Sequence, residues 1–232
     1  KGSKIALFFY SINYRKISKY QDNIKYLMFS WYLSYWSNIY VWSSLEIEFL
    51  KNNIKHPINF FVHPPVIFHR ANYFYDLNFK YCSIFDVQPL RPAIERASEI
   101  EIADYYNFNN AKKFIKDIID VAEKTNIRIV LKRKRNIGNK IHKRYENFLK
   151  KLESENKLFI VEFQYDIYRL IQHSVATIHM PYTSTAIHAR YLNISNNIYY
   201  EPTGEIYTHP LLNNGVKLIS SKKKLSNWFK NL

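Results

Sequence analysis

Cysteine, glycine and long apolar runs are all scarce in this sequence of 232 residues. Its single cysteine, Cys82, cannot form an intrachain disulfide, and no group of Cys and His has the spacing of zinc ligands. No uninterrupted apolar run approaches the roughly 18 to 20 residues that span a bilayer. These absences exclude a disulfide scaffold, a zinc module and a membrane-spanning helix. We therefore expect a chain from a reducing compartment. Its Lys-Gly-Ser start resembles neither a signal peptide nor an initiator, which indicates a fragment of a longer chain.

Acidic residues are also few, with 19 Asp and Glu against 34 Lys and Arg, which leaves a formal charge of +15. The sequence has only four glycines but 20 tyrosines, a bias that AT-rich codons produce. AT-rich codons also favour lysine, so part of the positive charge reflects the composition of the genome. However, residues 112–157 hold 15 Lys and Arg against 6 Asp and Glu. Such a concentration favours an anionic partner, for which nucleic acid, membrane headgroups and nucleotide phosphates are the candidates.

From residue 80 onward, short β-rich apolar runs alternate with amphipathic helical stretches. This pattern predicts an α/β fold with a Rossmann-like parallel sheet covered by helices. The expected strands are 81–87, 127–132, 158–163, 175–179 and 197–200, and the expected helices are 110–124, 139–152, 166–172, 186–192 and 222–231. Residues 1–79 contain two clear strands, 5–10 and 58–62, and are interpreted as part of a second Rossmann-like domain. We therefore expect two domains, 1–79 and 80–232.

A basic run follows one expected strand directly. Lys132, Arg133, Lys134 and Arg135 lead to Gly138, at a carboxyl end where open α/β sheets bind their ligands. Alternation along the extended chain would point Lys132 and Lys134 to one side and the two arginines to the other. The run favours a phosphate or carboxylate site, although a solvated basic loop is the alternative.

Three hydroxyl residues, Thr183, Ser184 and Thr185, lie between an expected strand and an expected helix. A helix N-terminus carries about half a positive charge and has unpaired N–H groups, so it can bind an oxyanion. An ordinary N-cap is the alternative, because Ser and Thr are favoured there in any case.

Two acidic residues end other expected strands. Glu201, after Tyr200, could accept hydrogen bonds from both ribose hydroxyls, or could belong to a plain surface loop. Asp86 would lie at the junction of the two domains, where a general base or nucleophile is useful. A structural Asp that caps the following turn is the alternative for Asp86.

Taken in order, several segments resemble bacterial surface-polysaccharide glycosyltransferases of the GT-B fold, of the capsule and O-antigen or lipopolysaccharide type. The likeness covers most of residues 80–232, and 1–79 looks like the later part of that family's first domain. The segments are 83–91 with Asp86 and Arg91, 131–138 with Lys132 and Gly138, 166–171, Met180-Pro181-Tyr182-Thr183-Ser184-Thr185-Ala186, and 199–204 with Glu201.

This resemblance implies a metal-independent transferase without a cofactor, which takes a nucleotide sugar as donor and a glycan or glycolipid as acceptor. The combination of basic strand end and Ser/Thr helix start is similar to the phosphate site of CMP-sugar enzymes of the sialyl and Kdo type. By this likeness the phosphate would be held by Lys132, Lys134, Thr183, Ser184 and Thr185, and the ribose by Glu201. Further nucleotide contacts are expected from Arg135, Gly138 and Tyr200. Transfer also needs a carboxylate that deprotonates the acceptor hydroxyl or attacks the anomeric carbon, and we select Asp86 for this catalytic role.

We expect a cytoplasmic protein, with peripheral contact to the inner membrane face as a further expectation. Nucleic acid is not expected as a partner, because the aromatic residues fall at core spacing and are not interleaved with the cations. A noncatalytic nucleotide- or sugar-binding domain is the main alternative function.

Overall fold

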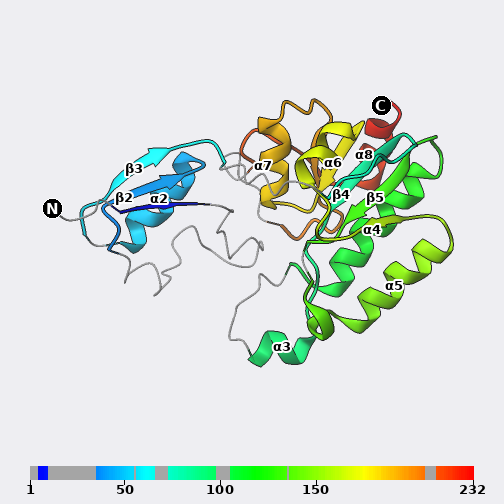
Figure 1. Cartoon of the computed structure of the whole chain (residues 1–232), viewed down its shortest axis with the longest axis horizontal. Helices are drawn as coiled ribbons and strands as arrows, with labels where there is room; N and C mark the ends of the chain where they lie inside the picture. The colour runs from blue at the N-terminus through cyan, green and yellow to red at the C-terminus, as the bar shows by residue number, and fades with distance from the viewer. Residues whose placement is uncertain are drawn as a thin grey trace.

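The computed structural model describes residues 5–9, 35–54, 56–65, 73–97, 105–134, 136–206 and 213–232. Within these ranges the chain forms two units, each built on a parallel β-sheet (Figure 1). The smaller unit contains the N-terminal strands, and the larger unit runs from residue 73 to the C-terminus.

The larger sheet has six strands, all parallel, in the order β6-β5-β4-β7-β8-β9. When the strands are renumbered within this sheet, the order is 3-2-1-4-5-6, which is the strand order of the Rossmann fold. This topology confirms the expected α/β class with a Rossmann-like parallel sheet. The strands are β4 (Tyr81–Phe85), β5 (Arg128–Lys132), β6 (Phe159–Val161), β7 (Ala176–His179), β8 (Asn197–Tyr200) and β9 (Lys217–Ile219).

Both faces of this sheet are buried, as parallel sheets require. In β4, Cys82 and Ile84 point to one hydrophobic cluster, whereas Tyr81 and Phe85 point to the other. The first face is covered by α4 (Phe108–Ala122), α5 (Lys143–Ser154) and α8 (Lys222–Phe229), and the second by α6 (Ile167–His173) and α7 (Ser184–Tyr191). Two short elements, α3 (Pro92–Ala97) and the 3-10 turn η1 (Gly138–Lys140), complete the described part of the unit.

The helices of the larger unit begin where the sequence supplies caps. The side chain of Asn107 accepts from the backbone N–H of Asn110 at the start of α4, and Asp166 accepts from two N–H groups at the start of α6. Along α4 the apolar positions recur at helical spacing, and all of them face the core. Among the described residues, no helix combines the length and apolar content needed to cross a bilayer.

The smaller unit has three parallel strands in the order β1-β2-β3, with α2 (Ser44–Asn53) connecting the last two. The strands are β1 (Ala6–Phe8), β2 (Asn38–Val41) and β3 (Asn59–Val62). The sequence predicted the first and third but not β2, because its four residues lie in a Tyr- and Trp-rich stretch without a clear alternation. The ring of Tyr40 stacks on Phe8 at 4.2 Å and on Phe61 at 4.9 Å, so an aromatic row crosses all three strands.

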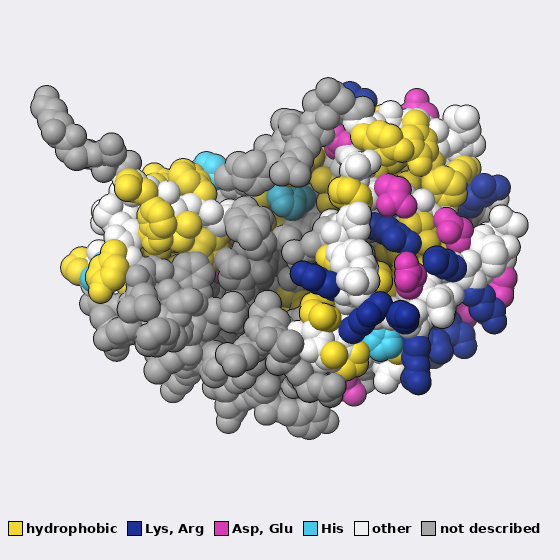
Figure 2. Space-filling view, turned by 60° about the horizontal axis from the view of Figure 1, so that its bottom comes forward, with side chains coloured by type: hydrophobic (Ala, Val, Ile, Leu, Met, Phe, Trp, Pro, Cys, Tyr) yellow, Lys and Arg dark blue, Asp and Glu magenta, His cyan; other side chains and the backbone are white. Residues whose placement is uncertain are grey.

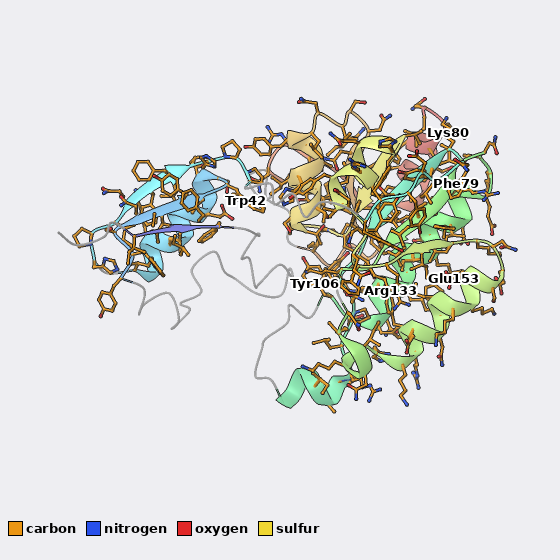
Figure 3. The ribbon with its side chains drawn as sticks, in the orientation of Figure 1. Trp42, Phe79, Lys80, Tyr106, Arg133 and Glu153 are labelled. Atoms are coloured by element: carbon orange, nitrogen blue, oxygen red, sulfur yellow. The ribbon has the colours of Figure 1, made fainter. Side chains whose placement is uncertain are left out.

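Helix α7 joins the two units. Its Ile187 belongs to the core cluster of the smaller unit, and its His188 meets the ring of Trp42 edge-on at 5.4 Å. Trp42 lies on the side of the smaller unit that is turned toward the larger one (Figure 3). Phe74 and Phe79 pack instead against the core of the larger unit, so the chain already contacts that unit before the expected boundary at 79/80.

Candidate functional site

The carboxyl ends of β4 and β7 meet at the point where the strand order reverses. Phe85 pairs with His179, and the backbone N–H of Met180 donates to the carbonyl of Phe85 at 2.9 Å. Open α/β sheets bind ligands at this edge. In Figure 3, Tyr106 and Arg133 lie toward this edge, whereas Lys80 and Phe79 lie at the opposite one. The predicted Asp86, basic loop and Ser/Thr turn are therefore all placed along one edge of the sheet.

The turn between β7 and α7 is held by hydrogen bonds from two tyrosines. Tyr106 donates its hydroxyl to the carbonyl of Pro181 at 2.8 Å, and Tyr199 donates to the carbonyl of Thr183 at 3.2 Å. Between these acceptors, the buried Tyr182 has a left-handed φ of 59°, which is unusual for an aromatic residue. Such strained positions persist where the surroundings determine them, and they cluster at ligand sites.

The first turn of α7 has no side-chain cap. Thr183 occupies the N-cap position, but its hydroxyl donates to the carbonyl of Met180 at 2.9 Å and does not reach the helix N–H groups. Thr185 forms a hydrogen bond of 2.7 Å with Nδ1 of His179. The half-buried Ser184 is the first helical residue, and its hydroxyl has no hydrogen bond within the described part of the chain. The first N–H groups of α7 thus have no side-chain acceptor among the described residues, and an anion could supply one.

His179 holds Thr185 in place as a neutral side chain. Burial lowers the pKa of His179 to about 3, and the ring stacks on Phe85 at 4.8 Å. At neutral pH the ring therefore carries no charge. Its role is consistent with the interpretation of this histidine as a packing residue.

Asp86, directly after β4, is 5% exposed, and Tyr145 from α5 donates its hydroxyl to Oδ2. The second oxygen, Oδ1, is buried and has no hydrogen-bond partner among the described residues. Burial raises the pKa of Asp86 to about 6, although the Tyr145 hydrogen bond and the charges of Lys134 and Arg133 act in the opposite direction. The catalytic role of Asp86 stays a prediction, but its environment is that of a tuned carboxylate.

The basic loop does not present its first lysine to the Ser/Thr turn. Lys132 is 8% exposed, and its ammonium donates to the carbonyl of Phe163 at 2.9 Å. Burial lowers the pKa of Lys132 to about 8. Because β4 separates β5 from β7, Lys132 is two strand spacings, roughly 10 Å, from the strand that leads to Thr183. Its phosphate contact stays a prediction.

Two further members of the predicted nucleotide site fall elsewhere on the loop. Lys134 is exposed in the loop two residues after β5, and Gly138 is the first residue of η1, with φ of +52°. Arg135 lies outside the described residues. Their roles stay predictions.

Glu201 and Tyr200 are bonded within the protein. Glu201 is 1% exposed and accepts from the hydroxyl of Tyr105 at 3.2 Å, from both the N–H and hydroxyl of Thr203, and from the N–H of Gly204 at 2.5 Å. Tyr200 donates to Asp117 at 2.9 Å. These bonds use the acceptor sites of the Glu201 carboxylate to shape the loop after β8. The predicted ribose contact of Glu201 is untested.

Sequence reasoning missed Tyr145 and did not select Arg133. Tyr145 lies 59 positions after Asp86, and only the packing of α5 against the sheet brings the two together. Arg133 was visible in the basic run, but no pattern marked it over its neighbours. In the ranges that the structure describes, no three His, Cys, Asp or Glu side chains gather closely enough to hold a metal ion.

The fold and the site define an α/β protein of the Rossmann-like class, with a strand-to-helix turn at its switch point. A family model described as polysaccharide biosynthesis PFTS motif protein matches residues 1–229. The chain therefore belongs to the family of polysaccharide biosynthesis PFTS motif proteins. In one-letter code PFTS is Pro-Phe-Thr-Ser, and the chain has this pattern at the β7–α7 turn, with Tyr in place of Phe: Pro181, Tyr182, Thr183 and Ser184.

Among solved structures, the chain is similar to a point mutant of S. aureus TarM in complex with Fondaparinux, alpha-GlcNAc-glycerol and UDP. The TM-score is 0.46 at 11% sequence identity, over 98% of this chain and 43% of that chain. The chain thus spans less than half the length of that protein. No curated protein matches the chain in sequence.

Proposed function

We propose that the protein is a glycosyltransferase of polysaccharide biosynthesis, which takes a nucleotide sugar as donor and a glycan or glycolipid as acceptor. One observation carries this proposal: the Pro181–Ser184 motif opens α7 at the switch point of a Rossmann-ordered sheet. Family membership supplies the polysaccharide context. The two parallel α/β units support a GT-B arrangement, in which the larger unit binds the donor and the smaller unit the acceptor.

The start of α7 would stabilise the phosphate that leaves with the nucleotide. Its uncapped N–H groups and the hydroxyl of Ser184 are donors, and the helix dipole favours negative charge. Fixed donors of this kind are effective because they are already oriented when charge develops on the leaving oxygen. In this proposal Thr183 and Thr185 shape the turn through their bonds to Met180 and His179.

Asp86 would act as the general base that accepts the proton of the acceptor hydroxyl. With a pKa of about 6, its carboxyl group is mostly ionised at neutral pH and still close enough to neutrality to take up a proton. Tyr145 holds Oδ2, so Oδ1 is the oxygen left for the acceptor. Tyr145 is therefore a positioning residue.

The finer points of the proposal are the base of the donor and the location of the enzyme. The resemblance in the sequence favours CMP as the nucleotide, without a metal ion. A cytoplasmic position with contact to the inner membrane face would bring the enzyme to a lipid-linked acceptor.

Thermal-shift titration of the whole chain with CMP, UDP, GDP and dTDP tests the proposal, because a ligand that binds the native state raises the melting temperature. At least one nucleotide should raise it, and Ser184→Ala should reduce that rise. Ser154→Ala, on the exposed end of α5, is the matched control and should leave it unchanged. No shift with any nucleotide would reject the donor site, and a shift with UDP or GDP alone would reject CMP.

A further inference from the structure

A small pocket lies at the carboxyl ends of β4, β5 and β6. One of its lining residues, Gln88, follows Asp86 by two positions, and the pocket lies on the side of β4 opposite to β7 and α7. Its volume is about 210 Å³. It is lined by residues from the loops that follow these three strands and from α5, among them Gln88, Arg133, Gly138, Glu146, Glu162 and Phe163. None of the three charged residues among them belongs to the predicted nucleotide site.

These three charged residues do not pair with one another. In the part of the chain that the structure describes, the side chains of Arg133, Glu146 and Glu162 form no hydrogen bond and no ion pair. The Nε atom of Arg133 is buried without an acceptor, and Oδ1 of Asp86 is buried without a donor. Buried polar atoms are costly when unpaired, so both indicate a missing partner. On the drawn face of the larger unit, basic and acidic side chains lie interspersed (Figure 2).

The pocket has room for one ring. Pockets that hold whole drug-sized ligands measure roughly 300–1,000 Å³, so about 210 Å³ is too small for an entire nucleotide sugar. The wall at Gly138 is open, because a Cβ built there would meet nothing within 4 Å. Asn136 accepts from the N–H of Gly138 at 3.0 Å and keeps this turn in place.

Given the proposed function, we propose that this pocket holds the transferred sugar and selects a neutral, hydroxyl-rich pyranose. The Arg133 guanidinium donates to ring oxygens and hydroxyls, while the Glu146 and Glu162 carboxylates accept from hydroxyls. An acidic sugar would place a third carboxylate beside these two, and like charges at close range repel. The donor is therefore a conjugate of a neutral sugar. This inference keeps the proposed glycosyl transfer but replaces the preference for CMP, because CMP-linked sugars of the sialyl and Kdo type are acidic, and it favours a UDP-linked donor instead.

The test compares ligands that differ in one group. Isothermal titration of the whole chain with UDP, UDP-glucose and UDP-glucuronate separates the nucleotide, the neutral ring and its carboxylate. UDP-glucose should bind roughly 10- to 100-fold more tightly than UDP, the range expected for charge-assisted hydrogen bonds. UDP-glucuronate should lose most of this gain. Equal or tighter binding of the glucuronate would overturn the proposal, as would a CMP-N-acetylneuraminate that binds more tightly than CMP.

Two pairs of variants locate the effect in the pocket. Arg133→Gln should remove the gain from glucose and leave UDP binding unchanged, and Glu162→Gln should narrow the difference between glucose and glucuronate. Arg128→Gln, at the other end of β5, and Glu153→Gln, at the opposite edge of the sheet, are the controls. If Arg133→Gln weakens free UDP as much as UDP-glucose, the pocket holds the nucleotide and the proposal fails.

Binding of sugars that carry no nucleotide distinguishes a failure of the sugar pocket from a failure of the proposed transferase function. Saturation-transfer NMR with methyl glucoside and methyl glucuronide needs no nucleotide. Arg133-dependent binding of the glucoside, with no binding of any nucleotide, would reject the transferase and leave the sugar pocket intact. Nucleotide binding with no gain from any sugar would reject the pocket alone.

Discussion

The amino and carboxyl edges of the larger sheet each carry a hollow, and the two hollows differ in whether a buried polar atom lacks a partner. At the amino edge a cavity of about 500 Å³ is lined by Glu123, Glu153 and Lys157, among others. There Lys157 bonds Glu123 at 3.1 Å. At the carboxyl edge the pocket is less than half as large, yet the charged groups on its wall are unpaired within the described ranges. In the described part of the chain, the Nε atom of Arg133 at the carboxyl edge is buried without a partner, and no polar side-chain atom of the amino-edge hollow is. This difference, and not the volume, is why we place the ligand at the carboxyl edge.

The largest effect is expected on the transfer rate when the carboxylate of Asp86, at the carboxyl edge, is removed. Asp86→Asn should lower the transfer rate by about 10²- to 10⁴-fold, the usual contribution of a general base. The asparagine has nearly the same shape and can still accept from Tyr145, so the fold should be retained and the variant should be no less stable at neutral pH. Initial rates of nucleotide release measure the loss. Glu123→Gln at the amino edge is the control, and an equal loss in that variant would erase the distinction between the edges.

A second test concerns Glu201, a carboxylate at the same edge whose oxygens already accept hydrogen bonds from the protein, unlike Oδ1 of Asp86. Glu201→Ala leaves the Tyr105 hydroxyl and two backbone N–H groups without their acceptor, and should cost about 3 kcal/mol of unfolding free energy. Urea unfolding measures it. The exposed neighbour Glu205→Ala should cost far less. If Glu201→Ala were neutral for stability and specific for nucleotide binding, Glu201 would be a ligand contact after all.

The pH dependence of the transfer rate tests whether Asp86 is the group that accepts the proton. The rate should rise with pH around 6, because Asp86 must be ionised to accept a proton. Tyr145→Phe removes a hydrogen bond that stabilises the charged form, so the midpoint should move to higher pH. Steady-state rates between pH 5 and 8 measure it. A midpoint that stays in place would show that another group controls the rate.

The free energy of unfolding should depend on the same carboxyl group, but it should fall with rising pH where the rate increases. Because folding raises the pKa of Asp86 from 3.8 to about 6, its contribution to stability is fully present below pH 4. That contribution is lost as the pH rises through 6. Asp86→Asn should remove this part of the pH profile.

The smallest effect is expected at the amino edge. Glu123→Gln breaks an ion pair between exposed side chains, which water already screens, so melting temperature and rate should both stay unchanged. Differential scanning fluorimetry at low and high salt measures it. A clear loss of activity would mean that the larger cavity has a function.

Much of the fold followed from local patterns. The continuous apolar runs predicted β4, β5, β7 and β8, and the helical spacing of buried residues predicted α4. The three-residue edge strand β9 and the short α3 were not predicted, since so few residues carry no periodicity.

The site could be predicted only in part. The position of the Ser/Thr turn and Asp86 at the carboxyl edge could be predicted because strand ends are visible in sequence, whereas their roles stay predictions. The pocket around Arg133 was not, because it depends on which strand pairs with which and on how α5 is rotated over them. For the same reason, the sequence could not tell that Glu201 uses its oxygens within its own loop.

Helix α7 begins at the Pro181–Ser184 turn and, within about one helical turn, reaches the neighbouring unit through Ile187 and His188. Eight residues of α-helix form a stiff rod of about 12 Å. A tilt of its first residues would therefore also move His188 against Trp42 of the smaller unit. Binding at the start of α7 would then be sensed by the packing between the two units.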